Sequence, residues 1–271
     1  MKTCVTLITL VFIAVPAFAQ ETVRKLEGPG QFSKYLTPGQ LDTWIFEGEK
    51  GETLIVHVAT KEFDSILELA LKGEKKLLQE IDDEGSDSRL AFRLPENGEY
   101  HIRIHAYKYQ GGGNYLLSVQ RFHAAPLEVG KPVVAALDHQ GNGYHYFKGV
   151  KDQVLIPQLK GTASDSWKML DFKGREMSGW AGTVLVEEQG EQYLLVSGEP
   201  GNRYDLLVRE AQQRNIGAKS DLTGQLQQGE MDVWSFQGKP GDFRLLEVEK
   251  KGQLAWRLVH APPEKKKAQH I

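Results

Sequence analysis

Residues 36–51, LTPGQLDTWIFEGEKG, return at an offset of 190 as residues 226–241, LQQGEMDVWSFQGKPG. The two stretches share Leu, Gly, Asp, Trp, Phe, Gly and Gly at matching positions and without a gap. A fainter copy lies between them at an offset of 101, with Leu137, Phe147 and Gly149 in place of Leu36, Phe46 and Gly48. Repeats of roughly ninety to a hundred residues have the size of single domains, so the chain is predicted to be a series of modules.

Alternation of apolar and polar residues marks the strands within the first repeat. Residues 67–71, 90–94, 100–106 and 115–119 place an apolar side chain at every second position. That period is typical of antiparallel strands with one buried face. Gly, Pro and Asn separate these runs, and no long amphipathic helix is evident. The predicted fold class is all-β, built from tandem antiparallel β-sandwich domains of jelly-roll-like form.

Five segments are expected along the chain: a signal peptide at 1–19, a β-sandwich at 22–122, a second, divergent β-sandwich at 123–211, an incomplete third repeat at 212–261 and a disordered tail at 262–271. The third repeat lacks counterparts of the strands expected at 100–106 and 115–119. A sandwich without them exposes apolar faces and open strand edges. Either this half-unit packs on the second module or the chain is a piece of a longer protein, and we favour the second interpretation.

The N-terminus has the composition of a secretory signal peptide, with Lys2, an apolar run at 5–15, and small residues at 17 and 19. We expect cleavage between Ala19 and Gln20 and a secreted or periplasmic location. The apolar run is too short to span a bilayer as a helix, and no second run follows. Cleavage removes Cys4, the only cysteine, so the mature chain has no internal disulfide.

Charge and composition bear on the partners. The formal net charge of −3 comes from acidic and basic residues that are mixed along the chain. A nucleic-acid binder needs a basic stripe, so no nucleic-acid partner is expected. The sequence carries no signal of oligomeric state.

An ordered series of motifs across residues 30–121 resembles the bacterial pre-peptidase C-terminal domain. The motifs are Gly39-x-Leu-Asp-x-Trp-x-Phe-x-Gly-x-x-Gly51, Phe63-Asp-Ser-x-Leu-x-Leu69, Asp82-Asp83, Leu94-Pro-x-x-Gly-x-Tyr-x-Ile102 and Gly113-x-Tyr-x-Leu-x-Val119. The later repeats match more loosely, and Gly143 stands where the first repeat has Asp42. The resemblance implies non-catalytic, jelly-roll-like modules of secreted enzymes or exported multidomain proteins. Some relatives bind calcium, and others bind collagen or polysaccharide.

Carboxylates form the first candidate site. Asp82, Asp83 and Glu84 lie in an acidic turn with Asp87 nearby, and Asp64 begins a neighbouring strand. Calcium takes six to eight oxygen ligands, which such a turn can supply, and the resemblance places Asp64 and Asp82-Asp83 on acidic motif positions. Ca2+ is therefore the one cofactor considered, with Asp64, Asp82, Asp83 and Glu84 as its ligands. The alternative is a solvated acidic turn with Asp64 capping a bend.

Aromatic residues form the second candidate site. Tyr107 and Tyr109 stand beside the glycine run 111–113, where their rings offer a platform for a sugar ring or a peptide. A plain long hairpin explains the same residues equally well. His101 and His105 are about 13 Å apart along one strand, too far to share a zinc ion, and are expected on a solvated strand face.

Catalytic motifs are absent from the sequence: it has no nucleophile elbow, no zinc-protease motif and no phosphate-binding loop. We therefore expect no enzyme, and a protein that binds an extracellular polymer such as a polysaccharide, or a partner protein. One alternative is a structural spacer or fragment of a larger exported protein, such as the accessory part of a secreted hydrolase. Another is a hydrolase with an unfamiliar site, which predicts a deep pocket lined by converging titratable groups.

Overall fold

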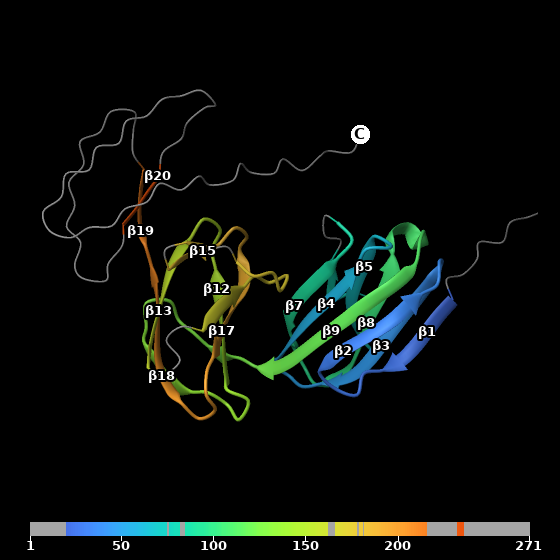
Figure 1. Cartoon of the computed structure of the whole chain (residues 1–271), viewed down its shortest axis with the longest axis horizontal. Helices are drawn as coiled ribbons and strands as arrows, with labels where there is room; N and C mark the ends of the chain where they lie inside the picture. Colours follow the sequence, from blue (N-terminus) through green and yellow to red (C-terminus); the bar gives the residue numbers. More distant parts are fainter. Residues whose placement is uncertain are drawn as a thin grey trace, which may run out of the picture.

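The computed structural model describes residues 20–74, 76–81, 85–161, 166–177, 179–180, 182–215 and 232–235 (Figure 1). The expected signal peptide and its cleavage, the C-terminal tail and most of the third repeat lie outside these residues. The described chain is built of strands, with one short 3-10 turn, η1 (Tyr107–Tyr109). The predicted all-β class, with antiparallel sheets stacked as sandwiches, is confirmed.

The first β-sandwich consists of a five-stranded and a four-stranded sheet. The five-stranded sheet has the order β1 (Gln20–Lys25), β3 (Gln40–Gly48), β8 (Gly98–Ala106), β5 (Ser65–Leu71) and β6 (Gln79–Ile81). The four-stranded sheet has the order β2 (Gly30–Leu36), β9 (Gly113–His123), β4 (Glu52–Thr60) and β7 (Ser88–Arg93). Every neighbouring pair is antiparallel except β1 and β3.

The second β-sandwich has the same order of corresponding strands. One sheet runs β10 (Ala125–Pro126), β12 (Asn142–Gly149), β17 (Gly190–Ser197) and β14 (Trp167–Leu170). The other runs β11 (Val133–Ala136), β18 (Arg203–Glu210), β13 (Val154–Gly161), β16 (Thr183–Leu185) and β15 (Gly179–Trp180). A further two-stranded sheet pairs β19 (Gln212–Asn215) with β20 (Asp232–Ser235).

The first sandwich, the second sandwich and the two-stranded sheet each begin with a pair of parallel strands, and the three pairs have the same register. Gln20 pairs with Gln40, Ala125 with His145, and Gln212 with Asp232. The partner is therefore always the residue twenty positions further along the chain. Backbone hydrogen bonds from Leu26 N to Ile45 O and from Leu127 N to Tyr146 O, each 2.8 Å long, extend the first two pairs in the same way.

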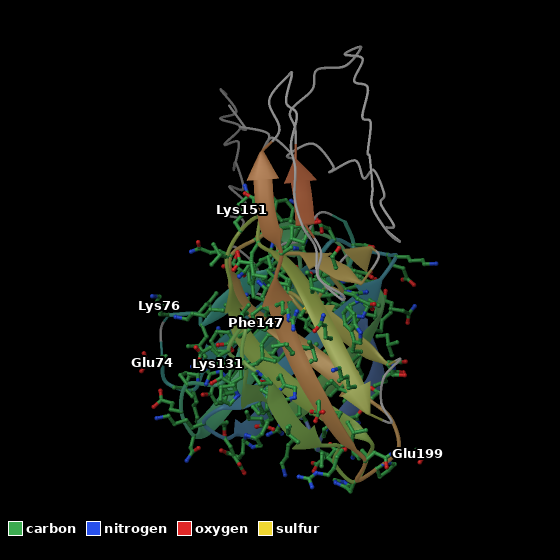
Figure 2. All side chains as sticks on the ribbon, turned by 90° about the vertical axis from the view of Figure 1, so that its left-hand side faces the viewer. Glu74, Lys76, Lys131, Phe147, Lys151 and Glu199 are labelled. Atoms are coloured by element: carbon green, nitrogen blue, oxygen red, sulfur yellow. The ribbon has the colours of Figure 1, made fainter. Side chains whose placement is uncertain are left out.

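The alternating residues of the sequence form the core of the first sandwich. Leu67, Leu69, Tyr100, Ile102, Ile104, Tyr115, Leu117 and Val119 are all buried between the two sheets. Burying a side chain of this size stabilises the fold by roughly 1.5–3 kcal/mol, so the two-residue period of the strands translates directly into a filled interior. In the second sandwich Phe147 is buried in the same way, whereas Lys131, Lys151 and Glu199 are exposed (Figure 2).

The motif residues of the first repeat meet in one buried polar cluster. The Tyr115 hydroxyl donates to Asp42 Oδ2 at 2.7 Å, and Trp44 Nε1 donates to the same hydroxyl oxygen at 3.2 Å. The Arg24 guanidinium lies 3.8 Å from Asp42 and over the Trp44 ring. Burial, followed by the hydrogen bond to Asp42, raises the pKa of Tyr115 well above its ordinary value, so this hydroxyl stays protonated and donates. Strand packing in this sandwich therefore depends on buried polar contacts as well as on apolar ones.

The two sandwiches contact each other through the outer faces of two sheets. Ile55 and Ala91 of the first module pack against Leu170, Tyr193 and Leu195 of the second. The chain passes between the modules without a linker, because β9 ends at 123 and β10 begins at 125 (Figure 1).

Polar contacts cross the same interface. Arg93 donates from Nε and Nη2 to the two carboxylate oxygens of Glu191, at 3.0 and 3.2 Å, and its guanidinium lies 4.2 Å from the centre of the Tyr146 ring. Phe122 and Tyr144 stack with their ring centres 3.9 Å apart. Contacts of this number and kind hold the modules in one relative orientation.

Candidate functional site

The η1 turn places two tyrosine rings on the surface at one end of the first sandwich. It follows β8 directly and leads through the glycine run into β9. Lys108 and Tyr109 both adopt left-handed backbone conformations, with φ of 52° and 56°. Residues other than glycine rarely adopt this conformation, and such strain is concentrated at functional sites. The result is that Tyr107 and Tyr109 remain 43% and 42% exposed.

His105 supports the Tyr109 ring from below. The two rings stack with centres 4.4 Å apart and planes 10° from parallel. The expectation of a solvated face is wrong for His105, which is 7% exposed, because the η1 turn folds Tyr109 over it. His101 is half-buried and contacts Glu99 at 3.0 Å.

Hydrogen bonds on both ring nitrogens favour the protonated form of His105. Burial on its own lowers the pKa of His105, but the contact of Nε2 with Glu68 and of Nδ1 with the Ala106 carbonyl outweigh it, so the pKa is raised above 6.5. Lys108 adds a positive charge, with Nζ 4.9 Å from the centre of the Tyr107 ring. The exposed tyrosines therefore lie beside two basic side chains, one of them below the ring.

Backbone and side-chain contacts anchor the turn to the neighbouring loop at 61–64. The Tyr107 amide donates to the Asp64 carbonyl at 2.8 Å, and Glu62 accepts from the amide and side chain of Asn114 at 3.1 and 3.0 Å. The structure thus brings Asp64, a residue of the predicted calcium site, next to the tyrosine turn. The hydrogen bonds to Asn114 lower the pKa of Glu62.

The calcium prediction is only partly accessible to the structure. Asp82, Asp83 and Glu84 lie outside the described residues, as does Asp165, the counterpart of Asp64 in the second repeat. Asp64 itself is exposed at the start of β5. Asp87 accepts from the Thr60 amide and contacts His57. Within the described residues, no three His, Cys, Asp or Glu side chains are arranged to hold a metal ion.

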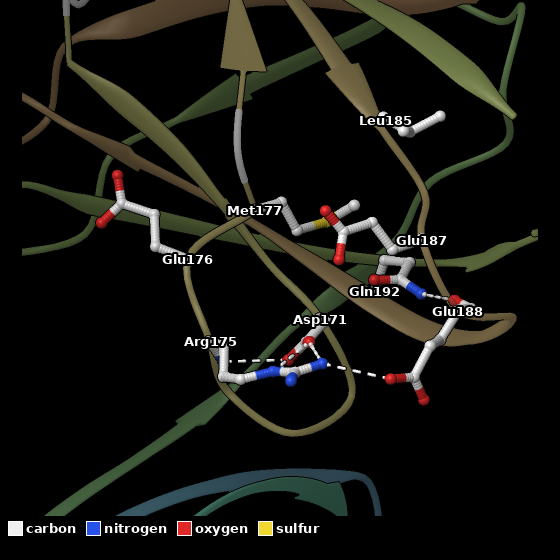
Figure 3. A pocket seen from close by; sticks show the side chains of 8 residues that line it. All are labelled: Asp171, Arg175, Glu176, Met177, Leu185, Glu187, Glu188 and Gln192. Atoms are coloured by element: carbon white, nitrogen blue, oxygen red, sulfur yellow. Dashed lines mark hydrogen bonds and ion pairs between the residues drawn. The ribbon is translucent and has the colours of Figure 1, made fainter. Parts of the chain in front are cut away.

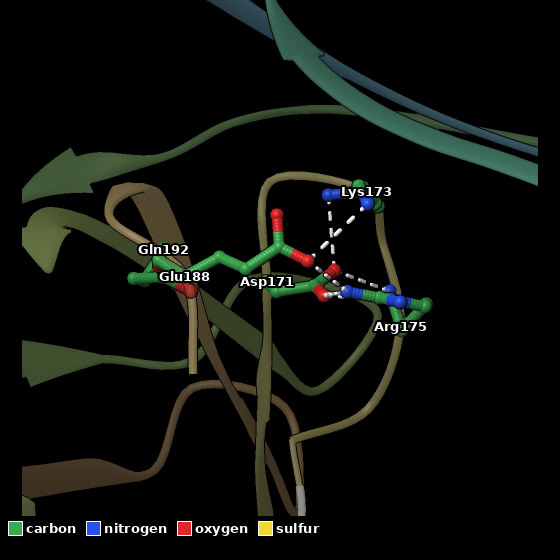
Figure 4. A network of polar contacts seen from close by, with 5 residues as sticks. All are labelled: Asp171, Lys173, Arg175, Glu188 and Gln192. Carbon is green, nitrogen blue, oxygen red and sulfur yellow. Dashed lines mark hydrogen bonds and ion pairs between the residues drawn. The ribbon is translucent and has the colours of Figure 1, made fainter. Parts of the chain in front are cut away.

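A small pocket in the second module gathers charged residues, and some of them pair with one another. It has a volume of about 180 Å³ and lies among the residues drawn in Figure 3. Arg175 Nε donates to Asp171 Oδ2 at 2.7 Å, while Glu188 contacts both Arg175 and Lys173 (Figure 4). Asp171 Oδ1 also accepts two backbone amides of its own turn. These contacts hold the turn together, while Glu176 and Glu187 also line the pocket.

The sequence identified the tyrosines but missed the residues beneath them. His105 and Glu68 lie on adjacent strands, where β5 and β8 pair in antiparallel register. Period two assigns both to the outer face of the sheet, and nothing in that pattern shows that a turn covers them. The available signal is the position of an aromatic turn immediately after the strand that carries the histidine.

Comparisons with known proteins give structural likenesses only. No protein-family model matches the chain, and no curated protein matches it. The pre-peptidase C-terminal domain of a collagenase from Bacillus anthracis is 16% identical, over 37% of this chain and 96% of that chain, with a TM-score of 0.33. A periplasmic inhibitor of g-type lysozyme from Aeromonas hydrophila is 14% identical, over 38% of this chain and 99% of that chain, with a TM-score of 0.31.

Tripeptidyl peptidase 2 is 10% identical over 69% of this chain and 24% of its own, with a TM-score of 0.24. All these scores are low, so they assign no activity to this chain. One similar structure is a pre-peptidase C-terminal domain, the family that the motifs resemble, yet no family model matches this chain. No helix in the described residues is long and apolar enough to cross a membrane.

Proposed function

We propose that this protein is an exported, non-catalytic β-sandwich protein of the pre-peptidase C-terminal type, and that it binds an extracellular polymer or a partner protein through the η1 turn. The observation that carries the proposal is the pair of exposed tyrosines on the η1 turn, Tyr107 and Tyr109, of which Tyr109 has a left-handed backbone and stacks on the buried His105. Rigid aromatic rings bind partners with little loss of conformational entropy, because the fold has already fixed them.

Pull-down of the full chain on insoluble collagen, peptidoglycan and cellulose tests the proposal, with soluble polysaccharides added in competition. We expect at least one of these materials to retain the protein. A Tyr107→Ala/Tyr109→Ala double variant is expected to lose that retention by at least tenfold, since aromatic anchors dominate binding surfaces. Val150→Ala is the control, because Val150 is 60% exposed and lies in the second module. Equal retention of both variants would sink the assignment of the turn.

Export and the lack of catalysis are separate parts of the proposal. N-terminal sequencing of protein recovered from culture medium or periplasm is expected to begin at Gln20. Screening against peptide, glycoside and ester substrates is expected to show no turnover.

A structural spacer is the second candidate function, and the contact between the modules favours it. The Arg93–Glu191 pair and the Phe122–Tyr144 stack fix the two sandwiches as a stiff unit, which is what a spacer requires. In that case the tyrosine variants have no phenotype in any binding assay, whereas loosening the interface impairs the larger assembly.

A further inference from the structure

The two sandwiches meet through unlike faces. The first module contributes the outer face of its four-stranded sheet, with Ile55 on β4 and Ala91 on β7. The second contributes the outer face of the sheet of β10, β12, β17 and β14, which corresponds in strand order to β1, β3, β8 and β5 of the first. Such a head-to-tail contact uses a different face of each module, so a further module can add to it in the same way.

Strand register identifies the equivalent of the first module's contact face on the second module. The motif Tyr-x-Leu-x-Val occurs at 115–119 in β9 and at 204–208 in β18, so an offset of 89 relates these two strands. Because β9 pairs with β4 and β18 with β13, Leu54 corresponds to Leu155. The outer-face residues around it follow from the same pairings, with Val154, Ile156 and Leu185 in the positions of Thr53, Ile55 and Arg93.

This outer face of the second module is apolar. Ile156, Leu185 and Leu207 are partly exposed, and Val154 and Ala211 are buried although the core of this sandwich includes neither. In Figure 1, β13 and β18 lie on the side of the second module that faces away from the first. Apolar side chains gathered on an outer face mark a surface that another part of a protein covers.

The outer face of the five-stranded sheet in the first module has the opposite character. It carries polar side chains where the second module has aromatic or aliphatic ones. In register, Thr43, His101 and Arg103 correspond to Tyr144, Tyr193 and Leu195. The latter three residues pack at the contact with the first module. Within the described chain, an apolar outer face therefore accompanies a contact between modules.

The chain leaves both modules from the same position of the same sheet. Phe122, near the end of β9, pairs with Thr53. Ala211 stands at the corresponding position after β18, and its amide donates to the Val154 carbonyl at 2.8 Å.

The connections that follow these positions have equal lengths. Three residues after the first, Ala125 forms a parallel pair with His145 of β12. Three residues after the second, Arg214 forms a parallel pair with Trp234 of β20. The third repeat thus begins with the connection and the register with which the second module begins.

We propose that the third repeat, residues 212–261, docks the sheet that β19 and β20 open on the outer face of β13, β16 and β18, as the second module docks on the first. The short connection keeps this segment at a high effective concentration beside the face, which favours it over a separate molecule. The contact involves the strands that open the repeat, so it does not depend on how the repeat is completed. It is also independent of the function proposed for the tyrosine turn.

Cross-linking tests this contact in the full chain with Cys4→Ser, which leaves no other cysteine. Leu185→Cys/Ser235→Cys labels the positions that correspond to Arg93 and Tyr146, where the guanidinium lies 4.2 Å from the ring centre. We expect a short bismaleimide reagent to link the new pair within one chain, at a rate similar to that of Arg93→Cys/Tyr146→Cys.

Val134→Cys/Ser235→Cys is the matched control pair. Val134 is 64% exposed on the same outer face, but it lies beside the far end of β13, roughly 20 Å from Leu185 along the strands. A docked third repeat is expected to make this control pair react at least tenfold more slowly than the Leu185–Ser235 pair.

A charge placed in the face provides the second comparison. Ile156→Glu would bury a carboxylate in the contact, so we expect it to slow the Leu185–Ser235 link at least tenfold. Lys160→Glu, at an exposed position on the same strand and face, is expected to leave the rate unchanged. Circular dichroism checks that both variants are folded.

A fast link within one chain that Ile156→Glu slows supports the proposal. A Leu185–Ser235 link no faster than that of the control pair overturns it, and so does a fast link that a folded Ile156→Glu variant leaves unchanged. A link that forms only between two chains also overturns it and assigns the face to a second copy. If Ile156→Glu does not fold, the rates of the two cysteine pairs decide by themselves.

Discussion

Tyr115 is the residue on which the buried polar cluster of the first module depends. Its hydroxyl donates to Oδ2 of Asp42 and accepts from Trp44, and both of these side chains are buried. Tyr115→Phe keeps the ring and leaves a buried carboxylate without its donor, so we expect the free energy of unfolding to fall by about 1–3 kcal/mol. Urea denaturation measures the change, and Tyr35→Phe, at an exposed position, is expected to have no effect. A loss equal to that of the control would show that Arg24 alone satisfies Asp42.

The stabilisation that His105 contributes to the fold is expected to depend on pH. Its pKa is raised above 6.5 in the folded state, so the stabilisation that it contributes is complete below pH 6.5 and is lost as the pH rises through the folded-state pKa. The groups that face it are Glu68, Glu80, Ala106 and Tyr109. We expect Glu68→Gln to lower the pKa of His105 in an NMR titration. Glu74→Gln, in an exposed turn, is expected to leave it unchanged, and a pKa insensitive to both changes would contradict the assignment.

At the scale of the element, the connection between β8 and β9 requires a glycine at position 112. A Cβ at Gly112 would lie 2.4 Å from the Leu36 carbonyl oxygen and 2.8 Å from Pro38 N, and both are backbone atoms that cannot move aside cheaply. We therefore expect Gly112→Ala to destabilise the first module by roughly 1–3 kcal/mol, the usual cost of overpacking. Gly28→Ala is the control, because nothing lies within 4 Å of its Cβ position. Thermal unfolding distinguishes the two, and equal midpoints would mean that the turn is free to shift.

Strands could be predicted from the sequence because their period is a local property. Residues 67–71 and 115–119 alternate with the period of a half-buried strand, and the structure buries the predicted faces. The burial of His105 could not be predicted in this way, since it arises from a turn that folds back over the outer face of its own strand. The tyrosines were visible in the sequence as an aromatic turn beside a glycine run.

At the scale of the whole molecule, the repeat at an offset of 101 predicted separate modules but not the contact between them. Outer-face residues such as Tyr144 and Tyr146 look like solvated strand residues in the sequence. In the structure their side chains pack against the interface cluster that Ile55 and Ala91 of the first module form with Leu170, Tyr193 and Leu195 of the second. The pairing of two outer faces follows from the short passage between β9 and β10, which leaves the modules no room to separate.

The relative orientation of the modules is expected to depend on the Arg93–Glu191 pair. Arg93 donates two hydrogen bonds to Glu191 and also covers the Tyr146 ring, so its guanidinium is fixed on two sides, and the hydrogen bond to Glu191 raises its pKa. Arg93→Glu places two carboxylates together at the interface. We expect it to widen the range of inter-module angles, measured as a larger radius of gyration in small-angle scattering and as unequal NMR alignment of the modules.

The charge-swapped variant, Arg93→Glu/Glu191→Arg, separates this ion pair from the apolar contact around it. The swap restores attraction between the same two positions, so it is expected to recover most of the original compactness, although the guanidinium no longer lies over Tyr146. If the single and the swapped variants both scatter like the unmodified protein, then the packing of Ile55 and Ala91 on Tyr193 and Leu195 holds the modules by itself, and the ion pair only covers its rim. If both are loosened, the contacts that the swap does not restore outweigh the charge pair: that of Arg93 with the Tyr146 ring, and the hydrogen bond from the Tyr193 hydroxyl to Glu191.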